Sequence, residues 1–216
     1  MNLNLLETVS TANISDAMDK LNLDGILEGI KLQNNMNMKI YGKAITVQFT
    51  DIIIENPMPL AIDAISKANE DNIIIMTSNG NLEVAIWGGI LSTSAKLKGI
   101  QGTILDGVCR DIDEIDEINY PMFSRGVAIK SPRNRLYQVS VNDQIQINNI
   151  IINPEDLIVA DSNGVVVIPK EKIEEVITLT IEIAKLEKQI VDNLESGEAV
   201  DESGEFKYMD FLNLKD

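Results

Sequence analysis

The residue types best suited to chemistry lie between Gly88 and Glu114, where a glycine pair precedes an Arg110-Asp111 pair. Adjacent glycines at Gly88 and Gly89 allow a tight turn and a close approach of the backbone to a ligand. A helix predicted to begin near Ile90 would direct its free N–H groups and its positive dipole end at a carboxylate or a phosphate. An ordinary connection between a strand and a helix also explains the glycines.

The Arg110-Asp111 pair follows a predicted buried strand, so it lies at that strand's carboxyl end, where open α/β sheets bind ligands. Arginine can clamp a carboxylate with two hydrogen bonds, and aspartate is a hard oxygen ligand that suits Mg²⁺. The alternative is a surface ion pair, worth about 0–1 kcal/mol. Glu114 lies one helical turn after Asp111, where it could orient a metal-bound water or act only as a solvated acid.

The elements that would position these residues follow from hydrophobic periodicity and from turn signals. Predicted helices span residues 10–22, 59–68, 91–98, 113–119 and 170–194. Predicted strands span residues 39–49, 72–77, 102–105 and 121–128, and shorter strands follow between 139 and 167. Helices that alternate with short apolar strands indicate one α/β domain over residues 1–195, followed by an acidic tail over 196–216. The strand-rich part near residues 120–168 would form a mixed sheet or a barrel-like core.

The composition excludes several classes of function. The 216 residues carry a net charge of −16, which argues against binding to nucleic acid or to an anionic membrane. No stretch approaches the roughly 18–20 apolar residues of a membrane span, and the N-terminus lacks the pattern of a secretory signal. Histidine is absent, so His-based triads and His-liganded zinc are excluded. Cys109 is the single cysteine, which excludes an internal disulfide and favours a cytoplasmic location.

These residues resemble the RraA-like family, which contains the class II 4-hydroxy-4-methyl-2-oxoglutarate / 4-carboxy-4-hydroxy-2-oxoadipate aldolases and the regulator of ribonuclease activity A. The aldolase signature is Gly-Asp, twenty residues, Arg-Asp, two residues and Glu. Here Gly88-Gly89, Arg110-Asp111 and Glu114 have the same spacing. Similarity extends over about residues 10–195, through the segments Ile14–Lys31, Tyr41–Gln48, Pro121–Leu136 and Asp156–Val176.

The resemblance implies a layered α/β/α domain with a central β-barrel-like core, assembled as a homotrimer or as a dimer of trimers (a homohexamer). Arg110 would bind the carboxylate of a small 2-oxo acid, and Asp111 would hold a divalent metal, Mg²⁺ or Mn²⁺. The backbone at Gly88, Gly89, Ile90 and Leu91 would complete the substrate site.

The implied activity is that of a metal-dependent lyase that cleaves the C–C bond next to a 2-oxo acid through a metal-stabilised pyruvate enolate. Retro-aldol cleavage of 4-hydroxy-4-methyl-2-oxoglutarate and decarboxylation of oxaloacetate both pass through that enolate. The alternative is a non-catalytic, protein-binding regulator resembling the regulator of ribonuclease activity A.

Gly89 departs from the family pattern, because it stands where the family aldolases have an acid. Loss of that acid removes one proton carrier, and general acid–base help is typically worth about 10²–10⁴-fold in rate. Glu114, Asp106 or a residue of a neighbouring subunit could compensate. A Gly89→Asp substitution is therefore predicted to raise turnover.

Overall fold

The structure, a computed structural model, describes residues 3–35, 37–55 and 61–196. The chain divides into two compact units, of which the larger spans residues 26–170 and carries every predicted site residue. The smaller unit joins the N-terminal segment to the C-terminal helix. It contains η1 (Leu3–Thr8), α1 (Thr11–Lys20) and α5 (Ile173–Glu195), and the short helix η2 (Lys170–Lys172) precedes α5.

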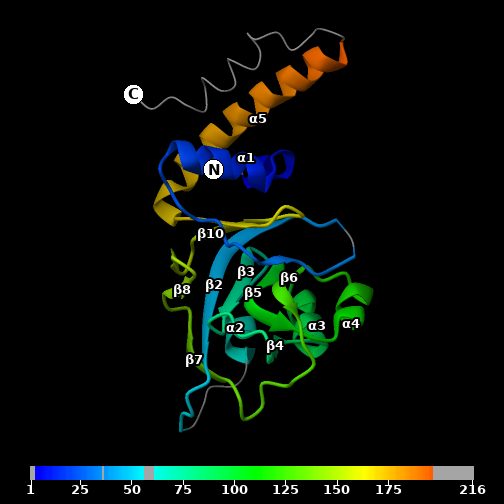
Figure 1. The fold of residues 1–216 in the computed structure, drawn as a ribbon, viewed down its shortest axis with the longest axis vertical. Helices are drawn as coiled ribbons and strands as arrows, with labels where there is room; N and C mark the ends of the chain where they lie inside the picture. Colours follow the sequence, from blue (N-terminus) through cyan, green and yellow to red (C-terminus); the bar gives the residue numbers. More distant parts are fainter. Residues whose placement is uncertain (1–2, 36, 56–60, 197–216) are drawn as a thin grey trace. The chain divides into compact units, whose positions relative to one another are not determined.

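A mixed sheet forms the centre of the larger unit (Figure 1). Its strands run in the order β1-β6-β5-β3-β2-β10-β11, while β4 pairs with β5 and β7 pairs with β2. The strands are β1 (Lys31–Leu32), β2 (Ile40–Thr50), β3 (Asn72–Thr77), β4 (Ala85–Trp87), β5 (Gly102–Cys109), β6 (Met122–Val127), β7 (Tyr137–Val141), β10 (Leu157–Ala160) and β11 (Val165–Ile168). The strands β2, β3, β5 and β6 run parallel to one another, and β4 runs parallel to β5.

The segment just before β1 brings the two ends of the sheet towards each other. Ile26 forms an antiparallel bridge with Val166 of β11, and the Leu27 N–H donates to the Val165 carbonyl. A few residues later, Lys31 and Leu32 pair with β6 at the opposite end. The sheet is therefore nearly closed, which confirms the predicted α/β class with a barrel-like core.

Alternation along the strands creates a core on each face of the sheet, because successive side chains of a strand point to opposite faces. On one face, Ile74, Met76 and Leu105 pack against α2 (Ile62–Lys67), α3 (Gly89–Leu97) and α4 (Ile112–Glu117). On the other face, Ile73, Ile75 and Ile104 pack against the hairpin of β8 (Ile145–Ile147) and β9 (Ile150–Ile152). Both cores are built mainly from aliphatic side chains, as the low aromatic content predicts.

The predicted elements are largely confirmed. The strand at 72–77 matches β3, and the helix at 10–22 matches α1, whose N-cap Ser10 accepts a hydrogen bond from the Asn13 N–H and forms a capping box. The predicted helix at 59–68 is observed over Ile62–Lys67, and its first residues lie outside the described part of the chain. The predicted division into one domain over residues 1–195 and a tail over 196–216 stays a prediction, because the residues beyond Ser196 lie outside the described part of the chain.

In the smaller unit, α1 and α5 pack against each other. The Asn13 side-chain amide donates a 2.5 Å hydrogen bond to the Glu187 carboxylate, and Val176, Ile177 and Ile183 of α5 are buried. Within residues 3–35, 37–55 and 61–196, none of the helices combines the length and the apolarity that crossing a bilayer requires.

Candidate active site

The predicted site residues lie together at the carboxyl ends of two adjacent parallel strands, β4 and β5. β4 ends at Trp87 and is followed by Gly88 and α3, while β5 ends at Cys109 and is followed by Arg110 and Asp111. The strands are neighbours, and the Arg110 N–H donates to the Trp87 carbonyl at 3.1 Å. The glycine turn and the Arg-Asp pair therefore lie side by side at the carboxyl ends of adjacent strands, as predicted.

A pocket of about 250 Å³ opens at this point. Gly88, Ile90, Leu91, Arg110 and Asp111 line it, so the structure brings together most of the residues predicted from the sequence. Its remaining lining residues were not predicted from the sequence. They are Ile62, Ala85, Ile86, Trp87, Ser131 and Pro132.

The first turn of α3 offers donors to this pocket. Gly88 is the N-cap in an extended conformation and has no side chain that could cap the helix. The Gly89 N–H donates to Asp111 Oδ2 at 3.1 Å, whereas the N–H groups of Ile90 and Leu91 have no acceptor among the described residues. These free N–H groups, at the positive end of the helix, suit a carboxylate or a developing oxyanion.

Asp111 is held in an unusual backbone conformation, with φ 59° and ψ 42°. The left-handed region is uncommon for residues other than glycine, although aspartate tolerates it better than most. In this position the Asp111 carboxylate lies at the N-terminus of α3, where its negative charge interacts favourably with the positive end of the helix dipole. The strained conformation thus connects the end of β5 to the start of α3.

Arg110 is only weakly engaged. Its Nε lies 3.4 Å from Asp111 Oδ2, and the two side chains are 40% and 34% exposed. An ion pair this exposed contributes about 0–1 kcal/mol. Among the described residues, the terminal guanidinium nitrogens of Arg110 have no hydrogen-bond or ion-pair partner, so they can bind an incoming carboxylate.

Glu114 occupies the space above Gly89. A Cβ atom built on Gly89 would overlap Glu114 Oε2 and would lie 3.2 Å from its Cδ. The Glu114 side chain is exposed and has no hydrogen-bond or ion-pair partner among the residues that the structure describes. The space where a side chain at position 89 would begin is thus filled by the carboxylate of another acid.

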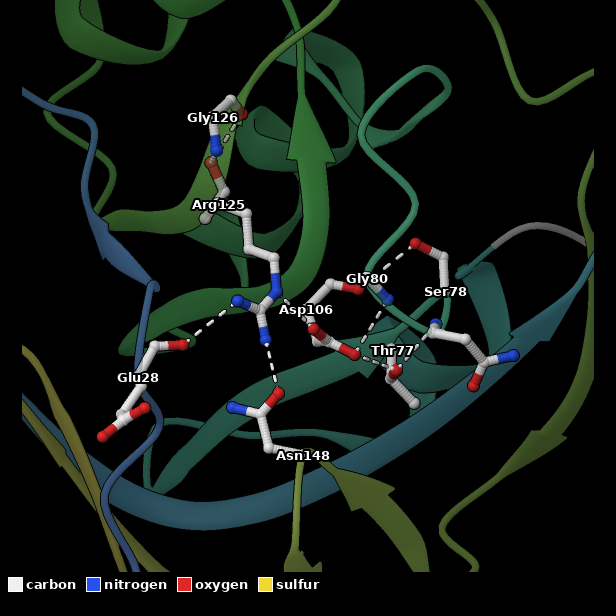
Figure 2. A network of polar contacts seen from close by, with 10 residues as sticks. Glu28, Thr77, Ser78, Gly80, Asp106, Arg125, Gly126 and Asn148 are labelled. Carbon is white, nitrogen blue, oxygen red and sulfur yellow. Dashed lines mark hydrogen bonds and ion pairs between the residues drawn. The ribbon is translucent and has the colours of Figure 1, made fainter.

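Asp106, the one acid on β5, is held in a separate network of polar contacts (Figure 2). It is 3% exposed, and its carboxylate accepts from Thr77 Oγ1 at 2.5 Å, from the Gly80 N–H at 3.1 Å and from Arg125 Nε at 2.5 Å. Asp106 is therefore not free to serve the pocket at Arg110. Of the two acids that could compensate for the missing acid at position 89, Glu114 lies against Gly89 and Asp106 does not.

Cys109 and Trp87 take structural positions beside the pocket. Cys109 is fully buried, and burial raises the pKa of its thiol although a hydrogen bond with Ser124 opposes the shift. Trp87 is 2% exposed, and its indole N–H donates to Ser92 Oγ at 2.8 Å. Cys109 is thus a packing residue, as the absence of an activating histidine suggests.

Comparisons with known proteins identify the family of this chain. The model of the RraA-like family, described as Aldolase/RraA, matches residues 11–167. The chain belongs to the RraA-like family. Its relatives include protein DlpA of Legionella pneumophila, 34% identical over 94% of this chain, which spans only 33% of DlpA. A protein of Halalkalibacterium halodurans, provisionally named a 4-hydroxy-4-methyl-2-oxoglutarate aldolase, is 33% identical over 79% of this chain and 77% of its own length.

Solved structures share the same fold. A crystal structure of an uncharacterized protein from Pseudomonas syringae superposes with a TM-score of 0.82 at 35% identity and covers 90% of this chain and 92% of that one. The Streptomyces coelicolor protein RraAS2, described as an unusual member of the RNase ES inhibitor RraA family, gives a TM-score of 0.79 at 22% identity over 86% and 94% of the two chains. The latter likeness concerns the fold alone.

Proposed function

We propose that this member of the RraA-like family is a lyase that cleaves the C–C bond next to a small 2-oxo acid, by retro-aldol cleavage of 4-hydroxy-4-methyl-2-oxoglutarate-type substrates, by oxaloacetate decarboxylation, or by both. One observation carries the proposal: free helix N–H groups, Arg110 and Asp111 line the same 250 Å³ pocket. Most of the pocket wall is apolar, and Arg110 is the only cation among the described residues that line it, so the pocket suits a small acid whose carboxylate lies against Arg110 and the helix N–H groups. The provisional aldolase names of its relatives agree with this class of reaction.

In this proposal, Arg110 binds the substrate carboxylate, and the N–H groups of Ile90 and Leu91 face the oxygens of the 2-oxo acid. These groups orient the bond to be broken and stabilise negative charge on the keto oxygen as the enolate forms. In the retro-aldol reaction, a base removes the proton of the 4-hydroxyl group, the C3–C4 bond breaks, and its electron pair enters the enolate. A proton then returns to C3 and gives pyruvate.

We assign these two proton transfers, from the 4-hydroxyl group and to C3, to Glu114. It lies against Gly89, within the turn whose neighbours Gly88 and Ile90 line the pocket, and its carboxylate is unpaired among the described residues. Asp111 is already bound to the Gly89 N–H and to Arg110, and Asp106 is buried in its own network. This assignment rests on the proposed activity.

The residues present fit a magnesium-like ion. The described residues contain no cluster of three acidic, cysteine or histidine side chains, so an ion caged by protein ligands is not expected. Mg²⁺, however, keeps several waters and needs only one or two carboxylates. Asp111 supplies one, because its Oδ2 accepts from Gly89 while its Oδ1 has no acceptor role among the described hydrogen bonds. A bound Mg²⁺ or Mn²⁺ would supply Lewis-acid polarisation of the keto oxygen.

A homotrimer or a dimer of trimers remains our proposal for the assembly. Two of the apolar side chains that line the pocket, Ile62 and Ile90, are 59% and 84% exposed. Burial of such side chains against another subunit would be favourable. Light scattering on the purified protein tests this assembly.

The experiment that tests the activity is pyruvate release from oxaloacetate and from 4-hydroxy-4-methyl-2-oxoglutarate, with Mg²⁺ or Mn²⁺ and with chelator. The Arg110→Ala variant tests the role of the arginine. It should stay folded, since removal of this side chain costs about 1 kcal/mol of stability or less. We expect metal-dependent turnover that the variant loses. Absence of turnover above the background of the metal alone, from a folded protein, would refute the proposal.

A non-catalytic regulator is the second candidate, and Gly89 is the observation that favours it, since the acid of the aldolase signature is missing there. A regulator would bind a protein partner, as the RNase inhibitor RraA family does by its name. A pull-down with a purified ribonuclease tests this candidate. Binding that survives Arg110→Ala, from a protein without lyase activity, would favour the regulator.

A further inference from the structure

A second polar cavity, of about 500 Å³, lies in the larger unit. Its lining includes Asn79, Asp106, Arg125, Gln146 and Asn148, none of which lines the pocket at Arg110. These residues come from four separate places: the loop after β3, the middle of β5, β6, and the β8–β9 hairpin. Side chains from such distant parts of the sequence converge here, and the proposed activity gives none of them a role.

The cavity is built around a buried ion pair (Figure 2). Arg125 Nε donates to Asp106 Oδ1 at 2.5 Å, and the other Asp106 oxygen accepts from Thr77 and Gly80. The Asp106 carboxylate is therefore satisfied within the protein. Since Asp106 and Arg125 are the charged residues of the lining, their charges cancel, and a single additional negative charge meets no net repulsion from the wall.

The groups left unused are mainly hydrogen-bond donors. Asn79 Oδ1 accepts from Gln48, and Asn148 Oδ1 accepts from Arg125 at 3.1 Å, which leaves both side-chain NH₂ groups without an acceptor among the described residues. Each terminal nitrogen of Arg125 has two N–H groups and makes one hydrogen bond here, to Glu28 or to Asn148. Gln146 donates to the Asn148 carbonyl, so its side-chain oxygen remains as an acceptor.

We propose that this cavity binds a small hydroxy-carboxylate anion. The unused amide and guanidinium N–H groups would hold the carboxylate, and the Gln146 oxygen would accept from a hydroxyl group. The volume lies within the range of about 300–1,000 Å³ that is typical of small-molecule sites. The site is separate from the pocket at Arg110, so it does not depend on the proposed lyase activity.

Calorimetric titration of the full chain with D-gluconate tests the proposal, with Asn79→Asp and Asn148→Asp as variants. Both changes keep the oxygen that accepts from Gln48 or Arg125, and both residues have a positive φ, 55° and 53°, which aspartate tolerates. Each change places a negative charge where the anion would bind. Asn142→Asp is the matched control, because Asn142 is also exposed, has φ 64° and does not line the cavity.

We expect gluconate to bind the wild type and the Asn142→Asp control equally, and to bind each of the other two variants about tenfold more weakly, since a charge-assisted hydrogen bond is replaced by repulsion. Arg110→Ala should leave gluconate binding unchanged while it abolishes pyruvate binding. Gluconate affinity that falls in Arg110→Ala but not in Asn79→Asp or Asn148→Asp would overturn the proposal. So would the absence of gluconate binding to the wild type at millimolar concentration.

Discussion

Glu114→Ala tests whether the carboxylate lying against Gly89 carries the acid function of the pocket. The side chain is exposed and has no polar partner among the described residues, so its loss should change the free energy of unfolding by no more than about 0.5 kcal/mol. The loss of a general acid–base group typically lowers turnover about 10²–10⁴-fold. At about 1.4 kcal/mol for each factor of ten, that corresponds to roughly 2.8–5.6 kcal/mol of activation free energy. The effect on rate should therefore far exceed the effect on stability.

Position 89 provides the complementary change. The structure predicts that Gly89→Asp alone brings no gain in turnover, because its Cβ would overlap the Glu114 carboxylate and the two acids would repel each other. This prediction is the opposite of the one made from the sequence, in which Gly89→Asp by itself raises turnover. In the double variant Gly89→Asp/Glu114→Ala the space is free, and we expect at least a tenfold recovery over Glu114→Ala.

The assay is pyruvate release in the presence of Mg²⁺, together with deuterium exchange into the methyl group of pyruvate, which reports proton transfer at C3 directly. Glu117→Ala is the matched control, because Glu117 is also an exposed acid on α4 and does not contact Gly89. Pyruvate affinity, followed by Trp87 fluorescence, should stay within threefold of wild type in every variant. An active wild type whose Glu114→Ala variant keeps at least a third of its turnover would refute the assignment of Glu114 and leave the lyase proposal standing.

Three further predictions follow from the site and its surroundings. Because burial raises the pKa of the Cys109 thiol, iodoacetamide should label it slowly in the native protein at pH 8 and rapidly in denaturant; equal rates would contradict its burial. Asp111→Gly should be more stable to urea than Asp111→Ala by about 1 kcal/mol, since only glycine adopts φ 59° without strain, and the reverse order would exclude a strained backbone there. The hydrogen bond from Lys130 lowers the pKa of the Glu83 carboxyl. The stability that this bond contributes is therefore present above the pKa of Glu83 in the unfolded chain and is lost as the pH falls through the lower pKa of the folded protein. An NMR titration in which Lys130→Met leaves the Glu83 pKa unchanged would disprove the coupling.

Local sequence patterns predict the helices and the longer strands of this protein. β3 could be predicted residue by residue, because Asn72–Thr77 is a compact apolar run that is buried on both faces. The segment from Gly88 to Glu114 likewise predicts a shared site, because it places a helix start after the glycines and the Arg110-Asp111 pair at the carboxyl end of a buried strand. The Ala85–Trp87 strand was missed, since three residues show no period, although the strand places Gly88 beside Arg110.

Features that depend on distant contacts could not be predicted. The bridge from Ile26 to Val166 joins segments far apart in the chain, and no local pattern marks it. The left-handed conformation of Asp111 accompanies a hydrogen bond from the Gly89 N–H, and Glu114 lies against the same glycine, so both features depend on a contact between residues more than twenty positions apart. Pro132 lies in a segment, Pro121–Leu136, that could be recognised by its resemblance to the family but not placed at the pocket.

Every residue of β5 is buried, and the strand contributes Asp106 to one cavity and leads directly into Arg110 at the other. Insertion or deletion of a single residue between them would shift Arg110 relative to Asp106, so that the two sites could not both keep their present register in the sheet. Substitutions at the strand end and changes in the surrounding loops, by contrast, can alter one site without shifting the other. The spacing between Asp106 and Arg110 should be the last part of the chain to vary in length.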